Sequence, residues 1–106
     1  PGLRIAHGTG IVIGNGVRIG RDCLLMQNVT LGAPSQARIG EMPALGDRVF
    51  VGAGAVILGP LHVGDDCFIG AHALVTEDVP PNTKVLPAGG VELRPRRQRG
   101  QHTDVR

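Results

Sequence analysis

A chain of 106 residues with a net charge of +2 has room for one domain and no more. It contains 17 Gly and 8 Pro but two Phe and no Trp or Tyr, so it cannot fill a wide core and suits a thin core repeated many times. The stretch 49–63 is apolar but short and interrupted by Gly and Pro, which excludes a membrane span. The opening residues lack the pattern of a signal peptide. We therefore expect a cytoplasmic protein.

Aliphatic residues recur at every sixth position, often with Gly directly after them and another apolar residue four positions later. A helix would show a period of 3.6 and a half-buried strand a period of 2. The period of six predicts an all-β fold, a parallel β-helix in which each hexapeptide forms one short strand and one corner and three hexapeptides complete a coil. We expect Gly at these corners because a side chain would resist the backbone conformation there. The repeating aliphatic residues are Ile13, Ile19, Leu25, Leu31, Leu45, Val51, Ile57, Val63, Ile69 and Val75.

The period divides the chain into a β-helix domain, residues 1–86, and a C-terminal extension, residues 87–106. One corner between Ile11 and Ile19 carries two extra residues, and a loop over 33–44 leaves the repeat altogether. Five of the eleven basic residues lie in the last thirteen positions, where we expect a short disordered basic tail. No aromatic residues accompany these arginines, which argues against nucleic acid as a partner.

Both cysteines occupy the inward position four residues after a repeating aliphatic residue. Counting coils places Cys23 and Cys67 on the same face and two coils apart, roughly 9–10 Å from each other at the usual strand spacing. A disulfide requires Cα atoms within about 7 Å. We expect reduced thiols that pack as small apolar side chains.

The same counting aligns four outward positions in one column along the axis of the β-helix: His7, Gln27, Ala53 and Ala71. An imidazole stands at one end and two alanines with neighbouring glycines at the other, about 14 Å away at strand spacing. A long thin ligand such as the pantetheine arm of coenzyme A would fit this column, with its reactive end at His7 acting as general base. The alternative is that His7 is an ordinary surface histidine and the alanines only fill corners.

Four segments carry a family resemblance. Residues 5–14 (IAHGTGIVIG), 27–32 (QNVTLG), 51–59 (VGAGAVILG) and 75–80 (VTEDVP) resemble the catalytic domain of serine O-acetyltransferases, which belong to the hexapeptide-repeat acyltransferases. The resemblance covers about residues 3–86. It implies a left-handed β-helix, because handedness does not follow from the spacing.

The resemblance also implies an acetyl-CoA-dependent enzyme that forms a homotrimer with active sites between subunits. The family's histidine falls on His7 and deprotonates the acceptor hydroxyl, while backbone amides stabilise the oxyanion. Family contacts to coenzyme A fall on Ala33, Ala53, Ala71 and Thr76. No metal is implied.

Two departures bear on the acceptor. Serine acetyltransferases carry Arg-His before the proline that is Pro43 here, whereas this chain has Glu41 and Met42 in the substrate loop. Glu41 would repel a substrate carboxylate, and Ala6 replaces the family's Asp before the histidine. We therefore expect the hydroxyl of another small molecule or of a saccharide as the acceptor. The family's N-terminal helical domain has no counterpart here, so the chain is either a fragment or a reduced homologue.

Two other functions remain as alternatives. A non-catalytic trimeric β-helix, serving assembly or binding, would lack the family's second histidine, as this chain does. A γ-carbonic-anhydrase-like metalloenzyme needs three histidines on zinc, and the spacing of His62 and His72 does not provide the close pair that family uses.

Overall fold

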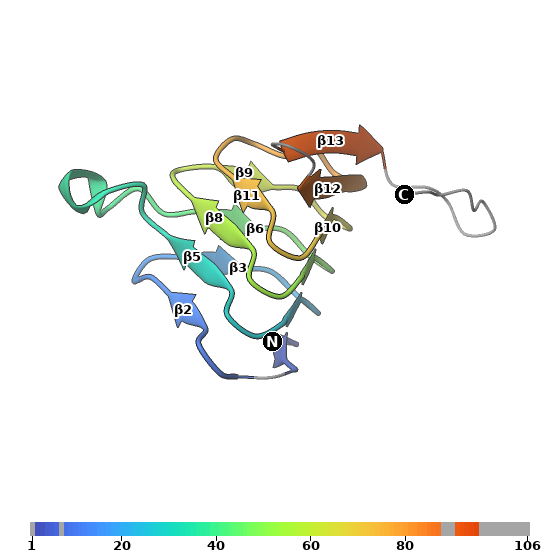
Figure 1. Cartoon of the computed structure of the whole chain (residues 1–106), viewed down its shortest axis with the longest axis horizontal. Coiled ribbons are helices and arrows are strands. Elements are labelled where there is room, and N and C mark those ends of the chain that lie inside the picture. The colour runs from blue at the N-terminus through green and yellow to red at the C-terminus, as the bar shows by residue number, and fades with distance from the viewer. Residues whose placement is uncertain (1, 7, 88–90, 96–106) are drawn as a thin grey trace.

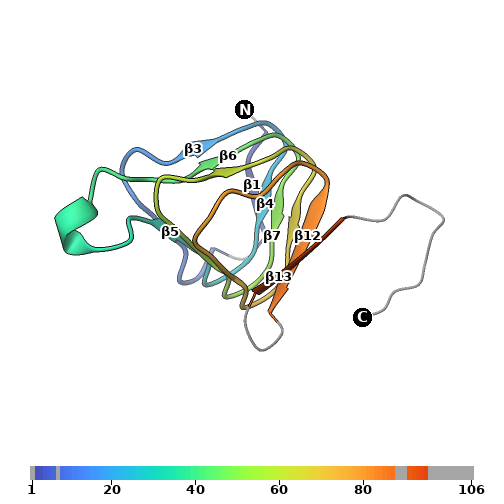
Figure 2. The same ribbon diagram turned by 90° about the horizontal axis from the view of Figure 1, so that it is seen from above.

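The computed structural model describes residues 2–6, 8–87 and 91–95, the last five by their backbone alone. Successive short strands belong in turn to three sheets, and each sheet forms one side of a triangular coil (Figure 2). Strand partners in adjacent coils are 18 positions apart where the repeat is regular, as in the pair Val51 and Ile69. This confirms the parallel β-helix that the period of six predicts.

The six-stranded sheet contains, in spatial order, β1 (Arg4–Ile5), β4 (Leu24–Leu25), β7 (Phe50–Val51), β10 (Phe68–Ile69), β12 (Thr83–Pro87) and β13 (Val91–Pro95). The four-stranded sheet contains β11 (Leu74–Val75), β8 (Val56–Leu58), β5 (Thr30–Gly32) and β2 (Val12–Ile13). The three-stranded sheet contains β3 (Arg18–Ile19), β6 (Ala44–Leu45) and β9 (His62–Val63).

The two irregularities of the repeat appear in the register. Ile5 pairs with Leu25, 20 positions away, whereas Val12 pairs with Thr30, 18 positions away. The two extra residues therefore lie between Ile5 and Val12, and the prediction that placed them between Ile11 and Ile19 was wrong. Leu25 pairs with Val51, which accommodates the longer insertion between β5 and β6. That insertion projects from one corner of the triangle and contains one 3-10 turn, η1 (Gln36–Arg38) (Figure 2).

The extension after residue 86 begins differently from its prediction. Strand β13 pairs antiparallel with β12, with Val85 opposite Leu93. It therefore adds a final strand to the six-stranded sheet at the top of the β-helix (Figure 1). The loss of the six-residue period hid this strand, because an antiparallel partner needs no coil of its own. The rest of the basic tail lies outside the described residues.

The core is the thin column of aliphatic side chains that the sequence predicts. Leu25, Val51, Ile57 and Ile69 are fully buried, as are both cysteines. The first coil differs, because Ile5 remains 46 % exposed with a neighbouring coil on one side only.

Glycine follows the repeating aliphatic residues for a reason other than the predicted one. Gly52 and Gly64 are not among the residues with positive φ, whereas corner residues such as Arg48 and Asp66 are. A Cβ on Gly52 would lie 2.7 Å from the backbone N of Ala71. The glycines are therefore required because adjacent coils approach too closely for a side chain, and the expectation of a special backbone conformation there was wrong.

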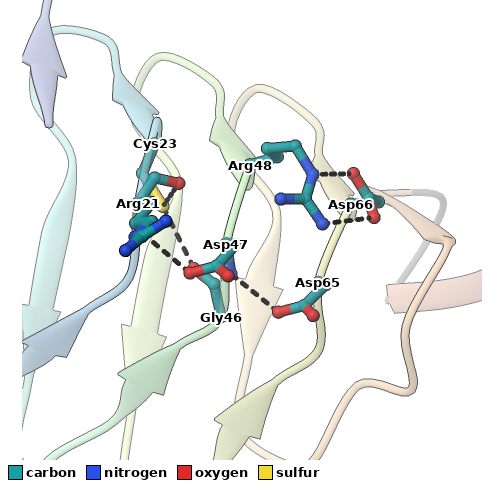
Figure 3. Close-up of polar contacts among 7 residues, drawn as sticks. All are labelled: Arg21, Cys23, Gly46, Asp47, Arg48, Asp65 and Asp66. Carbon is teal, nitrogen blue, oxygen red and sulfur yellow. Dashed lines mark hydrogen bonds and ion pairs between the residues drawn. The ribbon is translucent and has the colours of Figure 1, made fainter. Parts of the chain in front are cut away.

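Carboxylates link the coils at the corner that precedes the six-stranded sheet (Figure 3). The backbone N–H of Arg21 donates to Asp47 Oδ1, and the N–H of Asp47 donates to Asp65 Oδ1 one coil further on. The Arg48 guanidinium forms an ion pair with Asp66, with Nε 2.7 Å from Oδ1. These contacts connect the corners of successive coils.

Candidate functional site

The predicted column lies at the edge where β4, β7 and β10 end. Because Leu25, Val51 and Ile69 are paired in register, the residues two positions later are aligned as well. The N–H of Gly54 donates to the carbonyl of Gln27, and the N–H of His72 donates to the carbonyl of Ala53. The register thus confirms the alignment of Gln27, Ala53 and Ala71. His7 lies outside the described residues.

Ala53 and Ala71, with the glycines beside them, form a nearly flat strip on the surface, because none of their side chains is larger than a methyl group. Ala53 is half-buried and Ala71 is exposed. Beside them, a Cβ on Gly54 would lie 2.6 Å from His72 Nδ1, and the φ of Gly54 is 74°. No larger side chain can rise from the glycine positions without displacing the next coil. Such a strip can accept an extended ligand against its backbone, as the pantetheine arm requires.

Gln27 is a polar residue in this column to which the sequence assigned no role. Its Oε1 is inaccessible to solvent and has no hydrogen-bond partner in the described part of the chain. Buried polar atoms of folded proteins are rarely left in this state. The signal in the sequence was its place in the column, where it is the one amide side chain among His7, Ala53 and Ala71.

Ala33 and Thr76 lie at a different corner. Ala33 directly follows β5 and Thr76 directly follows β11, so both stand where strands of the four-stranded sheet end. The chain passes from Ala53 through the whole of β8 before it reaches this corner. Ala33 and Thr76 are level with the end of β8, five to six residues after Ala53, which is at most about 16–20 Å at about 3.3 Å per residue. One chain therefore does not bring the four predicted coenzyme A residues to one place.

Glu41 has a partner in the protruding loop. The Arg38 guanidinium at the end of η1 forms an ion pair with it, with Nη2 2.6 Å from Oε1. The hydrogen bond and the charge of Glu41 raise the pKa of Arg38 above its ordinary value. The positive charge of Arg38 thus offsets part of the negative charge of Glu41, which weakens the expected repulsion of a substrate carboxylate. The two residues are three positions apart, and the turn η1 brings their side chains together.

Met42 packs against the preceding coil. A Cβ on Gly14 would lie 2.8 Å from Met42 Cε, and one on Gly16 would lie 3.5 Å from Met42 Cγ. These glycines belong to the corner between β2 and β3. Pro43, directly after Met42, is fully buried. The loop therefore returns to the β-helix at Met42, which supports the loop.

The described residues contain no group of three or more His, Cys, Asp and Glu side chains arranged to hold a metal ion. His62 belongs to β9 in the three-stranded sheet, whereas His72 lies at the corner after β10. Within the same residues, no helix is long and apolar enough to cross a membrane.

Comparisons with known proteins agree with the β-helix fold. The family described as "Bacterial transferase hexapeptide (six repeats)" matches residues 43–77. The serine acetyltransferase of Mycobacterium tuberculosis is 43% identical over 86 residues, which cover 81% of this chain and 38% of that protein. The chain is a serine-acetyltransferase-like member of the hexapeptide-repeat proteins.

A second serine acetyltransferase, from Helicobacter pylori strain J99, is 46% identical over 87 residues, 82% of this chain and 51% of that protein. The crystal structure of Neisseria gonorrhoeae serine acetyltransferase superposes with a TM-score of 0.82 at 35% identity, covering 90% of this chain and 37% of that one. The serine-acetyltransferase-like chain thus has the left-handed parallel β-helix fold. It spans about half or less of the length of these relatives.

Proposed function

We propose that this chain is the β-helix of an O-acetyltransferase that moves an acetyl group from acetyl-CoA to the hydroxyl of an acceptor. The observation that carries the proposal is the alignment of Gln27, Ala53 and Ala71, and position 7 is proposed as the reactive end of their column. On either side of that position, the N–H of Ala6 donates to the carbonyl of Leu25 and the carbonyl of Thr9 accepts from the N–H of Asn28. The carbonyl of Thr9 thus takes the place in the ladder that the carbonyls of Gln27 and Ala53 hold in the following coils, and we propose that His7, two residues before Thr9 in the sequence, supplies the general base.

Acetyl transfer requires a general base, donors to the carbonyl oxygen and residues that hold coenzyme A. Acetyl-CoA supplies the activated acetyl group when it is bound. The imidazole of His7 takes the proton of the acceptor hydroxyl as its oxygen attacks the thioester carbonyl, and returns a proton to the departing sulfur. Backbone N–H groups near the strip stabilise the negative charge on the carbonyl oxygen. Ala53 and Ala71 hold the pantetheine arm, whereas Ala33 and Thr76 contact coenzyme A from the other corner.

The separation of the two corners supports a homotrimer. Ala53 and Ala71 end strands of one sheet, while Ala33 and Thr76 end strands of the next. A ligand that touches Ala53 and Ala71 of one copy and the Ala33–Thr76 corner of another lies between two copies of the chain, as in a trimer with sites at its interfaces. Light scattering on the purified protein tests the trimer, and a stable monomer that binds coenzyme A contradicts it.

The acceptor is a hydroxyl compound whose class the loop helps to define. The printed names of the relatives make serine the first compound to test. Glu41 and Met42 favour a different small molecule or a saccharide. The ion pair with Arg38 makes this argument weaker, because it offsets part of the charge of Glu41. A panel containing serine, other hydroxy amino acids, sugars and amino sugars separates these acceptors.

The decisive experiment follows the release of coenzyme A from acetyl-CoA with that panel. His7→Ala should reduce acetyl transfer by about 10²–10⁴-fold, the usual contribution of a general base. His62→Ala, which removes an exposed histidine of the three-stranded sheet, is the matched control and should keep full activity. If the His7→Ala variant turns over as fast as wild type, His7 is not the general base. A folded trimer that transfers to no acceptor would instead favour a non-catalytic assembly subunit.

A further inference from the structure

Gln27 carries a buried hydrogen-bond acceptor without a donor. The backbone N–H groups around it are already engaged: Met26 donates to Val51, Asn28 to Thr9, and Gly54 to the carbonyl of Gln27 itself. Its Oε1 is nevertheless withdrawn from solvent and unpartnered in the described part of the chain. Leaving such an atom unpaired is costly, which indicates that a group from outside this chain supplies the donor.

The position of Gln27 limits what that donor is. It stands one coil from Ala53, about 4.8 Å along the column, on the side toward position 7. Next to it, Ala53 and Ala71 offer only methyl groups and backbone. A ligand lying along the strip therefore meets its first polar side chain at Gln27, close to its reactive end. Since an amide oxygen accepts only, the ligand must present an N–H or O–H there.

We propose that Gln27 Oε1 accepts a hydrogen bond from the pantetheine amide N–H nearest the sulfur of coenzyme A. This inference rests on the proposed function. Two methylene groups separate that amide from the sulfur, so the contact fixes where the thioester carbonyl stands relative to position 7. Gln27 is thus a residue that binds and positions the cofactor.

Calorimetric titration of the full chain with coenzyme A tests this contact without relying on turnover. Gln27→Met keeps the length of the side chain and removes the acceptor, so it should weaken binding by about 2–10-fold. Gln27→Glu keeps an acceptor oxygen and should bind more tightly than Gln27→Met. Adenosine 3′,5′-bisphosphate, which lacks the pantetheine arm, is the control ligand and should bind wild type and Gln27→Met equally well.

A coenzyme A analogue with an ester oxygen in place of that N–H identifies the donor. Wild type should lose about 2–10-fold in affinity for the analogue, while Gln27→Met should lose nothing further, because the two changes remove one bond. If wild type binds the analogue as tightly as coenzyme A, or if the two losses add, the inference is wrong. Should wild type bind neither coenzyme A nor the bisphosphate, the proposed function fails and this inference with it.

Discussion

The carboxylate of Asp47 accepts a hydrogen bond from the backbone N–H of Arg21 in the preceding coil, with Oδ1 2.8 Å from the nitrogen. The N–H of Asp47 donates in the same way to Asp65, at 2.7 Å (Figure 3). Corners leave backbone N–H groups outside the strand ladders, and side-chain oxygens of the next coil satisfy them. The stacking of coils thus depends on polar contacts at the corner as well as on the aliphatic core.

Asp47→Ala should lower the free energy of unfolding by about 0.5–1.5 kcal/mol, because the N–H of Arg21 loses its acceptor. Asp47→Asn keeps an oxygen at the same place and should cost less. Urea denaturation followed by circular dichroism measures both variants. If alanine and asparagine destabilise the protein equally, the hydrogen bond contributes nothing measurable.

Gly52→Ala should destabilise the β-helix by about 1–3 kcal/mol or more, because its Cβ would lie 2.7 Å from the backbone N of Ala71 in a fully occupied interior. Gly40→Ala is the matched control, since nothing lies within 4 Å of a Cβ there. That variant should stay within about 0.5 kcal/mol of wild type. Thermal unfolding of the two proteins makes the comparison, and equal midpoints would contradict the close approach of the coils.

Ala53→Trp and Ala71→Trp should each abolish binding of coenzyme A, because the indole would cover the strip against which the pantetheine arm lies. Both positions face outward, so the fold should survive. Arg18→Trp places the same ring on the exposed face of the three-stranded sheet and should bind normally. Calorimetry gives the affinities. Normal binding by both alanine variants would show that the column is not the cofactor site.

The two cysteines should be inert toward thiol reagents in the folded protein. Cys23 and Cys67 are fully buried, and their Sγ atoms lie 3.2 Å and 3.1 Å from the carbonyl oxygens of Gly46 and Pro80. Ellman's reagent should therefore find both thiols only after denaturation. Reaction with the native protein at the rate of a free thiol would contradict this burial.

Burial also raises the pKa of the Cys23 thiol above its ordinary value of 9.0. The unfolded chain then loses this proton at lower pH than the folded one, so the stabilisation is complete below about pH 9 and is lost as the pH rises through the folded value. Denaturation curves at increasing pH should show this decline. Cys23→Ala should reduce it, and an unchanged decline in that variant would assign it to other groups.

Much of the fold could be predicted because the interior of a β-helix repeats. An inward residue such as Val51 meets the same surroundings in every coil, so its spacing predicts the sheets, the register and the column of Gln27, Ala53 and Ala71. Strand β13 escaped prediction, because antiparallel pairing to an edge leaves no six-residue signature. The reason for the glycines was also wrong, since a clash between coils is invisible to a single hexapeptide.

The sequence by itself determined which positions face inward and which outward positions line up, because both follow from counting along a regular coil. The tertiary structure decided what surrounds those positions. It left Gln27 Oε1 without a donor, paired Glu41 with Arg38 and turned Met42 onto the corner at Gly14. The contact of Met42 with the corner at Gly14 joins segments whose spacing follows no repeat, so the path of the chain in space alone brings them together, whereas the pair of Arg38 and Glu41 depends on the local turn η1.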